Sequence, residues 1–103
     1  MIDAGRFLDE ARERGFSLYS GVPCSYLKPL INRVIDSDIL RYVGAANEGD
    51  AVAIAAGAQL GGIRAVAMFQ NSGLGNAVNP LTSLTDTFRI PILLITTAIN
   101  GSM

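Results

Sequence analysis

The sequence of 103 residues contains no histidine and a single cysteine, Cys24. Without histidine, the chain lacks the most common general base and metal ligand of proteins. A disulfide or a cysteine-based zinc site needs more than one thiol, so a single cysteine excludes both within the chain. A single unpaired cysteine is also typical of a protein in a reducing compartment. Neither Cys24 nor Ser25 can be activated by an imidazole of this chain, which excludes Cys–His and Ser–His catalysis within it.

The chain also lacks an excess of charge of one sign and any long hydrophobic run. Eight basic residues stand against nine acidic ones, so we expect no nucleic-acid footprint and no polybasic membrane patch. The apolar runs fall short of the roughly 20 residues of a membrane-spanning helix, and the first ten residues lack the basic-then-apolar order of a signal peptide. We therefore expect a soluble, cytoplasmic protein that binds neither nucleic acid nor membranes.

Half of the residues are apolar, and the length allows one domain with one hydrophobic core. Hydrophobic periodicity and turn signals predict an alternation of helices and strands. The predicted strands cover 16–20, 40–45, 64–69 and 90–97. The predicted helices are a short one ending before Gly15, one over 27–36 with Pro29 in its first turn, one over 48–60 capped by Asn47, and one that ends near Phe88. The last helix begins at either Gly75 or Pro80, and the sequence leaves this open because proline suits a first turn and not an interior.

This alternation predicts an α/β fold, a doubly wound parallel sheet of the flavodoxin-like type, with strand order 2-1-3-4. In such sheets the functional groups gather outside the carboxyl ends of the strands, at the switch in strand order. The loops that leave the first three strands are 21–25, 46–50 and 70–76. They are also the most unusual stretches of the sequence, and we expect the functional site there.

Glu48 follows an apolar strand and lies at the start of a helix that is rich in alanine and glycine from Ala51 to Gly62. One interpretation is that acids favour helix N-termini because the helix dipole is positive there. The other starts from the helix itself: small residues on every face let another backbone come close, usually from a second domain or subunit. Glu48 would then lie in a dry interface and act as a proton donor and acceptor.

Two further loops carry polar groups. The turn 70–76 offers amide and hydroxyl side chains with two glycines, and it matches neither a P-loop nor a dinucleotide fingerprint. It either caps the next helix or presents donors to a polar ligand. In the turn 21–25, the sequence favours a structural role for Cys24 and an N-cap role for Ser25.

Together these segments resemble the pyrimidine-binding (PYR) domain of thiamine-diphosphate-dependent decarboxylases, most of all phosphonopyruvate decarboxylase and the alpha subunit of sulfopyruvate decarboxylase. The likeness runs from Gly21 to Ile95. It rests on Gly-Val-Pro-Cys-Ser at 21–25, on Asn-Glu-Gly-Asp-Ala at 47–51, and on Asn-Ser-Gly-Leu-Gly-Asn-Ala-Val-Asn-Pro-Leu at 71–81. Many members of the wider superfamily have Gly-Pro-Gly at 73–75, so Leu74 favours the phosphonopyruvate and sulfopyruvate branch.

The resemblance implies that residues 1–103 are the N-terminal part of such a domain, truncated after the fourth strand. The residue matching Glu48 hydrogen-bonds the pyrimidine of thiamine diphosphate and promotes the tautomer that activates the cofactor. The family also implies cofactor contacts by Asn71, Ser72, Gly73, Leu74 and Asn76, and substrate contacts by Pro23, Cys24, Ser25 and Asn71.

The implied reaction is loss of carbon dioxide from a small 2-oxo acid such as phosphonopyruvate or sulfopyruvate, which leaves an aldehyde. The diphosphate and its Mg²⁺ would be held by a partner domain or beta subunit in a homo- or hetero-oligomer, and this chain would hold no metal. Two alternatives stay open: a non-catalytic scaffold or regulatory domain of the same fold, and a flavodoxin-like module that binds a nucleotide or flavin.

Overall fold

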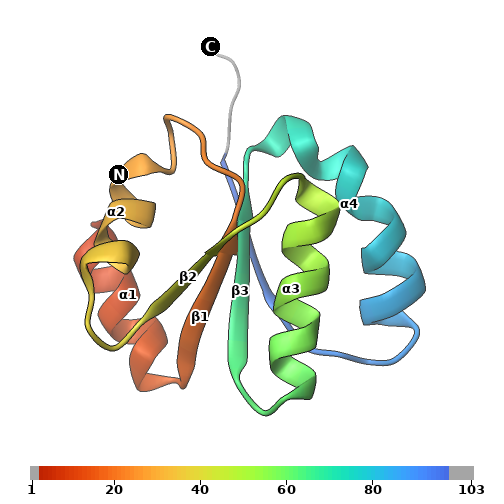
Figure 1. The fold of residues 1–103 in the computed structure, drawn as a ribbon, viewed down its shortest axis with the longest axis horizontal. Coiled ribbons are helices and arrows are strands. Elements are labelled where there is room, and N and C mark those ends of the chain that lie inside the picture. Colours follow the sequence, from red (N-terminus) through yellow and green to blue (C-terminus); the bar gives the residue numbers. More distant parts are fainter. Residues whose placement is uncertain (1–2, 98–103) are drawn as a thin grey trace.

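The computed structural model describes residues 3–97 and contains one sheet of four parallel strands. The sheet order is β2-β1-β3-β4, and neighbouring strands pair in parallel throughout. The predicted α/β class and strand order are therefore confirmed (Figure 1). The strands are β1 (Phe16–Gly21), β2 (Arg41–Gly44), β3 (Arg64–Phe69) and β4 (Leu93–Thr96).

Helices cover both faces of the sheet (Figure 1). One face carries α1 (Ala4–Glu13) and α2 (Lys28–Asp36), and the other carries α3 (Glu48–Leu60), α4 (Leu74–Pro80) and the π-helical η2 (Leu81–Asp86). A short 3₁₀ turn, η1 (Asn71–Gly73), joins β3 to α4. Two apolar clusters result, one on each side of the sheet. The first contains Leu8, Tyr19, Leu27, Ile31, Val34, Val66 and Met68, and the second contains Leu18, Ala51, Val52, Ala55, Ala65, Ala67, Phe69 and Ala77.

The local sequence explains where the main elements begin and end. After α1 the chain turns at Gly15, whose φ of 91° lies in the left-handed region that glycine adopts without strain. Asn47 has extended backbone, and its Oδ1 accepts a hydrogen bond from the Asp50 N–H at 2.9 Å, so α3 begins at Glu48 as predicted. β3 is buried at every position after Arg64, as a strand covered on both faces should be.

Two sequence-based expectations were wrong. Ser25 does not cap α2: the N-cap is Leu27, which makes no side-chain cap hydrogen bond, because a turn from Cys24 to Leu27 delays the helix. The last strand is shorter than predicted and begins at Leu93. Before it, Pro91 has no N–H to donate, and the Ile90 N–H bonds the Thr85 carbonyl instead of a neighbouring strand.

The start of the last helix, which the sequence left open, lies at Leu74, so Pro80 ends α4 inside a continuous helical segment. The proline removes one intrahelical donor, and directly after it, at Leu81, the helix changes to π geometry. Thr82 Oγ1 donates to the Val78 carbonyl at 2.8 Å and Ser83 Oγ donates to the Asn79 carbonyl at 2.7 Å. These hydroxyls, which follow the interruption, supply donors to two carbonyls that precede it.

Within residues 3–97, no helix has both the length and the apolar character needed to cross a membrane.

Candidate functional site

The three loops singled out in the sequence leave the sheet on the same side, because they follow the carboxyl ends of the parallel strands β1, β2 and β3 (Figure 1). In the description of the site, the edge of the sheet means this side, where the strands end. The first residues of these loops extend the backbone pairing of the strands. The Val22 N–H donates to the Met68 carbonyl at 3.0 Å, and the Ala45 N–H donates to the Gly21 carbonyl at 2.8 Å. The edge is therefore anchored to the sheet, and groups placed on it have a rigid support.

Gly21 is the last residue of β1, and neighbouring atoms leave no room for a side chain at this position. A Cβ at this position would lie 3.2 Å from the Tyr42 ring and 3.3 Å from the Met68 carbonyl oxygen. The Tyr42 hydroxyl donates to the Gly21 carbonyl at 3.2 Å. Glycine at 21 thus allows β2, β1 and β3 to approach one another where the site begins.

Glu48 is the first residue of α3, and its half-buried side chain leans across the edge toward the segment that follows β3. Asn76 Nδ2 donates a hydrogen bond to Glu48 Oε1 at 2.9 Å. Gly73 lies directly against the same side chain: a Cβ there would overlap Glu48 Cγ, Cδ and Oε2. Residues that are 25 and 28 positions away in the chain therefore hold this carboxylate on two sides.

The backbones of α3 and α4 also meet at this point. A Cβ on Gly49 would lie 3.0 Å from the Asn76 carbonyl oxygen, which is tighter than ordinary van der Waals contact. That carbonyl is the acceptor that the N–H of residue 80 would use in an α-helix, and Pro80 has none to offer. The proline and the glycine together thus allow the first turn of α3 to sit against α4.

The small residues of α3 serve close packing inside this chain. Ala51, Ala55 and Ala56 are fully buried, and Ala51 and Ala55 belong to the apolar cluster between α3 and the sheet. Ala53 and Gly57 lie on the outer side of the helix and are exposed. The close approach inferred from the sequence is therefore found with the chain's own elements, while an approach by a second domain or subunit would have to use the outer side.

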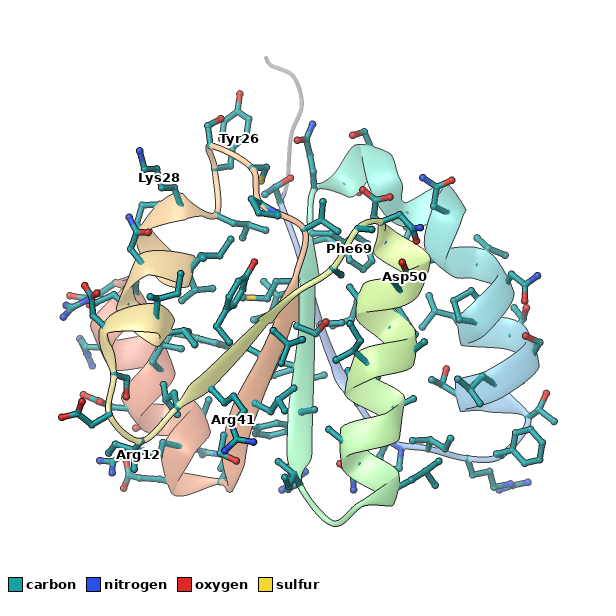
Figure 2. The ribbon with its side chains drawn as sticks, in the orientation of Figure 1. Arg12, Tyr26, Lys28, Arg41, Asp50 and Phe69 are labelled. Carbon is teal, nitrogen blue, oxygen red and sulfur yellow. The ribbon has the colours of Figure 1, made fainter. Side chains whose placement is uncertain are left out.

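The other residues expected at the site are on the same edge, and they do not all converge on Glu48. Asn71, Ser72 and Leu74 are exposed, and the Asn71 N–H donates to Thr97 Oγ1 at 3.1 Å, which ties the loop after β3 to the end of β4. Figure 2 shows Asp50 at the tip of α3 and Phe69 close to the same edge.

The turn 21–25 leads to α2, on the opposite face of the sheet from α3. Pro23 and Ser25 are exposed, whereas Cys24 is half-buried against the apolar cluster beneath α1 and α2. This packing agrees with the structural role that the sequence favours for Cys24. The candidate site thus lies at the carboxyl ends of the strands, at the switch in strand order, with Glu48 on one face of the sheet and the turn 21–25 on the other.

The described residues contain no group of three or more acidic, cysteine or histidine side chains that could hold a metal ion. Two surface hollows, of about 560 and 310 Å³, open elsewhere. Their linings come from the segment before β4 and from α1, α2 and the loop before β2, so both lie toward the amino ends of strands. The edge around Glu48 is an open surface of this chain, and a second surface would be needed to enclose a ligand on it.

The sequence places Glu48 in one motif and Gly73 and Asn76 in another, and it does not predict that the two motifs are in contact. The contact depends on the depth to which η1 enters the edge, which no local pattern reports. Thr97, whose Oγ1 accepts the hydrogen bond from the Asn71 N–H, belongs to none of the sequence motifs. The sequence marks it only by its place at the carboxyl end of a predicted strand, where functional loops gather.

The family model described as thiamine pyrophosphate enzyme, N-terminal TPP binding domain, matches residues 4–102. The chain belongs to this family. It is 53% identical over 97 residues to a phosphonopyruvate decarboxylase of Streptomyces viridochromogenes, which is 94% of this chain and 24% of that protein. It is 35% identical over 83 residues to the sulfopyruvate decarboxylase subunit alpha of Methanococcus maripaludis, which is 81% of this chain and 50% of that subunit.

A second phosphonopyruvate decarboxylase, from Streptomyces hygroscopicus, is 52% identical over 97 residues. The chain therefore spans about a quarter of the length of these phosphonopyruvate decarboxylases and half of the alpha subunit. Membership in the TPP-binding family fits the edge described above. A carboxylate is held there, with one oxygen hydrogen-bonded to Asn76 and with its side chain directly against the backbone of Gly73.

Proposed function

We propose that this chain is the pyrimidine-binding part of a thiamine-diphosphate-dependent decarboxylase, with Glu48 as the carboxylate that activates the cofactor. The substrate would be a small 2-oxo acid such as phosphonopyruvate or sulfopyruvate, and the products the corresponding aldehyde and carbon dioxide. The overall reaction is redox-neutral, since the carboxylate leaves as carbon dioxide and a proton takes its place. The names of the relatives support the reaction, and the clamped carboxylate of Glu48 at the switch point is the observation that carries the proposal.

In this proposal Glu48 binds a ring nitrogen of the pyrimidine and shares a proton with it. Bound thiamine diphosphate would supply an electron sink for the departure of carbon dioxide. Asn71, Ser72, Gly73, Leu74 and Asn76 would border the cofactor, because they occupy the loop that packs against Glu48. The rigid anchoring of this loop to β3 and to Thr97 would keep these groups in place.

Pro23, Cys24, Ser25 and Asn71 would border the substrate at the switch in strand order. The turn 21–25 and the loop after β3 leave neighbouring strands and diverge to opposite faces of the sheet. Such a divergence opens the space that ligands of doubly wound sheets occupy. Which of these side chains touches the substrate is part of the proposal.

The diphosphate and its Mg²⁺ would be held outside this chain. Within residues 3–97 no acidic cluster suits a metal ion, and the relatives are two to four times as long as the matched segment. We infer a partner, either a diphosphate-binding domain of the same polypeptide or a beta subunit. The partner would also exclude water from Glu48, which is only half-buried in this chain.

The proposal is tested by Glu48→Gln in the assembled enzyme, with the diphosphate-binding part present and the cofactor saturating. We expect kcat to fall about 100-fold or more, because an amide cannot exchange a proton with the pyrimidine. The matched control is Asp50→Asn, which makes the same carboxyl-to-amide change at an exposed residue in the same helical turn. A kcat within a few-fold of the parent for Glu48→Gln would remove Glu48 from the mechanism.

A binding experiment separates this function from the two alternatives. Thiamine diphosphate with Mg²⁺ should bind the assembled protein, and FMN should not compete with it. Saturable binding of FMN alone would point to a flavodoxin-like module. Assembly with the partner without binding of either cofactor would point to a non-catalytic scaffold.

A further inference from the structure

The hydrogen bond between Asn76 and Glu48 is unusual among the contacts of this chain. Of the hydrogen bonds that join two side chains within residues 3–97, it alone connects residues more than four positions apart. The other hydrogen bonds by which side chains reach distant segments use a backbone group. The one long-range hydrogen bond between two side chains in this part of the chain therefore ends on the carboxylate to which the proposed function assigns the chemistry.

The surroundings of the pair restrict how the carboxylate can turn. Gly73 is buried, and its backbone lies against the Glu48 side chain so closely that no Cβ fits. The Asn76 carbonyl lies against Gly49, which fixes the backbone of the donor relative to the first turn of α3. Both ends of the hydrogen bond are thus attached to backbone that cannot shift independently.

We propose that Asn76 is a positioning residue that acts through Glu48. This inference rests on the proposed function of Glu48. The Asn76 side-chain amide donates a hydrogen bond to Oε1, and an amide does not release its proton to a carboxylate. Asn76 therefore orients the carboxylate without taking part in proton transfer. A carboxylate accepts several hydrogen bonds, and with one of them fixed the remaining lone pairs are presented in a single arrangement. Orientation of a reacting group of this kind lowers the entropic cost of its reaction.

This role differs from the direct cofactor contact that the family resemblance implies for Asn76, and the two make different predictions. A residue that binds the cofactor directly should weaken cofactor binding when it is removed. A residue that orients Glu48 should slow activation while leaving cofactor affinity nearly intact. The two roles are therefore separated by measuring both quantities on the same variants.

The test uses the assembled enzyme with bound thiamine diphosphate and no substrate, and measures proton–deuterium exchange at the thiazolium carbon by NMR. For Asn76→Ala we expect exchange to slow about 10- to 100-fold, with the dissociation constant of the cofactor changed by less than about threefold. Asn76→Gln keeps an amide donor and should lose less than the alanine variant. Asn79→Ala is the control, since Asn79 is an exposed asparagine of the same helix whose side chain contacts Ser83 and not Glu48.

A second measurement needs no cofactor. Asn76→Ala should lower the thermal unfolding midpoint more in the parent than in a Glu48→Ala background, because only the parent has the hydrogen bond to lose. Asn76 is exposed, so its truncation leaves no buried cavity that would obscure the comparison.

The outcomes distinguish this inference from the proposed function. If Glu48→Gln abolishes exchange and Asn76→Ala does not slow it, the positioning role is overturned and the function of Glu48 stands. If Asn76→Ala weakens cofactor binding as much as it slows exchange, Asn76 is a direct cofactor ligand and the positioning role is again overturned. If exchange survives Glu48→Gln, the proposed function itself fails.

Discussion

Two tyrosines that pair across β1 and β2 differ in what their hydroxyl groups contact. Tyr19, on β1, is fully buried, and within the described residues its hydroxyl has no hydrogen-bond partner. Tyr42, on β2, is half-buried and donates to the Gly21 carbonyl at 3.2 Å. A buried hydroxyl without a partner loses its hydration and gains nothing in return. The two residues therefore form a natural pair for comparison.

We predict that Tyr19→Phe raises the free energy of unfolding at pH 7 by about 1 kcal/mol, because it removes an unsatisfied group and keeps the ring. Tyr42→Phe should instead lower it by about 1 kcal/mol, because it breaks a hydrogen bond at the entry to the site. Denaturant titration of the two variants and the parent measures both changes. Destabilisation by both variants would mean that the Tyr19 hydroxyl has a partner, such as a buried water.

The same pair has a pH dependence of known sign. Burial raises the pKa of Tyr19 from 10.0 to about 12, and burial also raises the pKa of Tyr42. A raised pKa in the folded state means that folding favours the neutral phenol. Its contribution to stability is complete below pH 10 and is lost as the pH rises toward 12. The parent should therefore lose stability between pH 10 and 12, and Tyr19→Phe should lose less.

Single residues also show how far the sequence could lead toward the site. Glu48 was identified because an acid at the tip of a helix of small residues is a local pattern. The contacts of Glu48 with Gly73 and Asn76 could not be predicted in the same way. They join segments more than 20 residues apart and depend on how deeply the loop after β3 packs. The N-cap predicted at Ser25 was wrong because a turn intervenes before α2, and the same propensity applied correctly to Asn47.

Among the elements, α3 has the least conventional composition for a core helix, and its packing makes a sharp prediction. Ala55 and Ala56 have no exposed surface, and Ala55 belongs to the cluster between α3 and the sheet. Ala55→Leu or Ala56→Leu should each destabilise the fold by about 1–3 kcal/mol, because the added carbons have no space. Ala53 is exposed in the same helix, so Ala53→Leu is the matched control.

Ala53→Leu also reports on the outer side of α3. If that side is free in the assembled protein, the variant should keep its stability and its assembly, since leucine is nearly as good a helix former as alanine. Size-exclusion chromatography with denaturant titration measures both properties. Unchanged stability in the Ala55 and Ala56 variants would contradict the close packing of α3 against the sheet.

The elements that the sequence predicted best are those whose limits are set locally. α3 and β3 have the predicted bounds, since Asn47 caps the helix and an apolar run between polar ends defines the strand. The beginning of β4 and the path through Pro80 were predicted less well. Each depends on which partner a backbone group finds: the Ile90 N–H bonds the Thr85 carbonyl instead of a strand, and the Asn76 carbonyl, which has no N–H at Pro80 to accept from, lies against Gly49.

At the scale of the whole molecule, the two outermost strands of the sheet, β2 and β4, differ in charge. β2 forms one edge and carries Arg41, an exposed cation that Figure 2 shows at its start. β4 forms the other edge with Leu93, Leu94 and Ile95, all half-buried, and carries no charge. Charged side chains discourage the pairing of an edge with another chain, and uncharged apolar edges invite it. The β4 edge is therefore the side on which further chain can add.

We predict that the 103-residue chain, prepared by itself, associates in preference to staying monomeric, and that the β4 edge carries the contact. Thr96 is the exposed last residue of β4, so Thr96→Lys should shift the chain toward monomer by placing a charge on this edge. Asn32→Lys introduces the same charge at an exposed position of α2, far from the edge, and should leave association unchanged.

Light scattering over a concentration series measures the mass of all three proteins. A parent that stays monomeric at high concentration and unfolds cooperatively would show that this edge recruits no second chain. Equal effects of the two lysine variants would show that net charge, and not the edge, controls association.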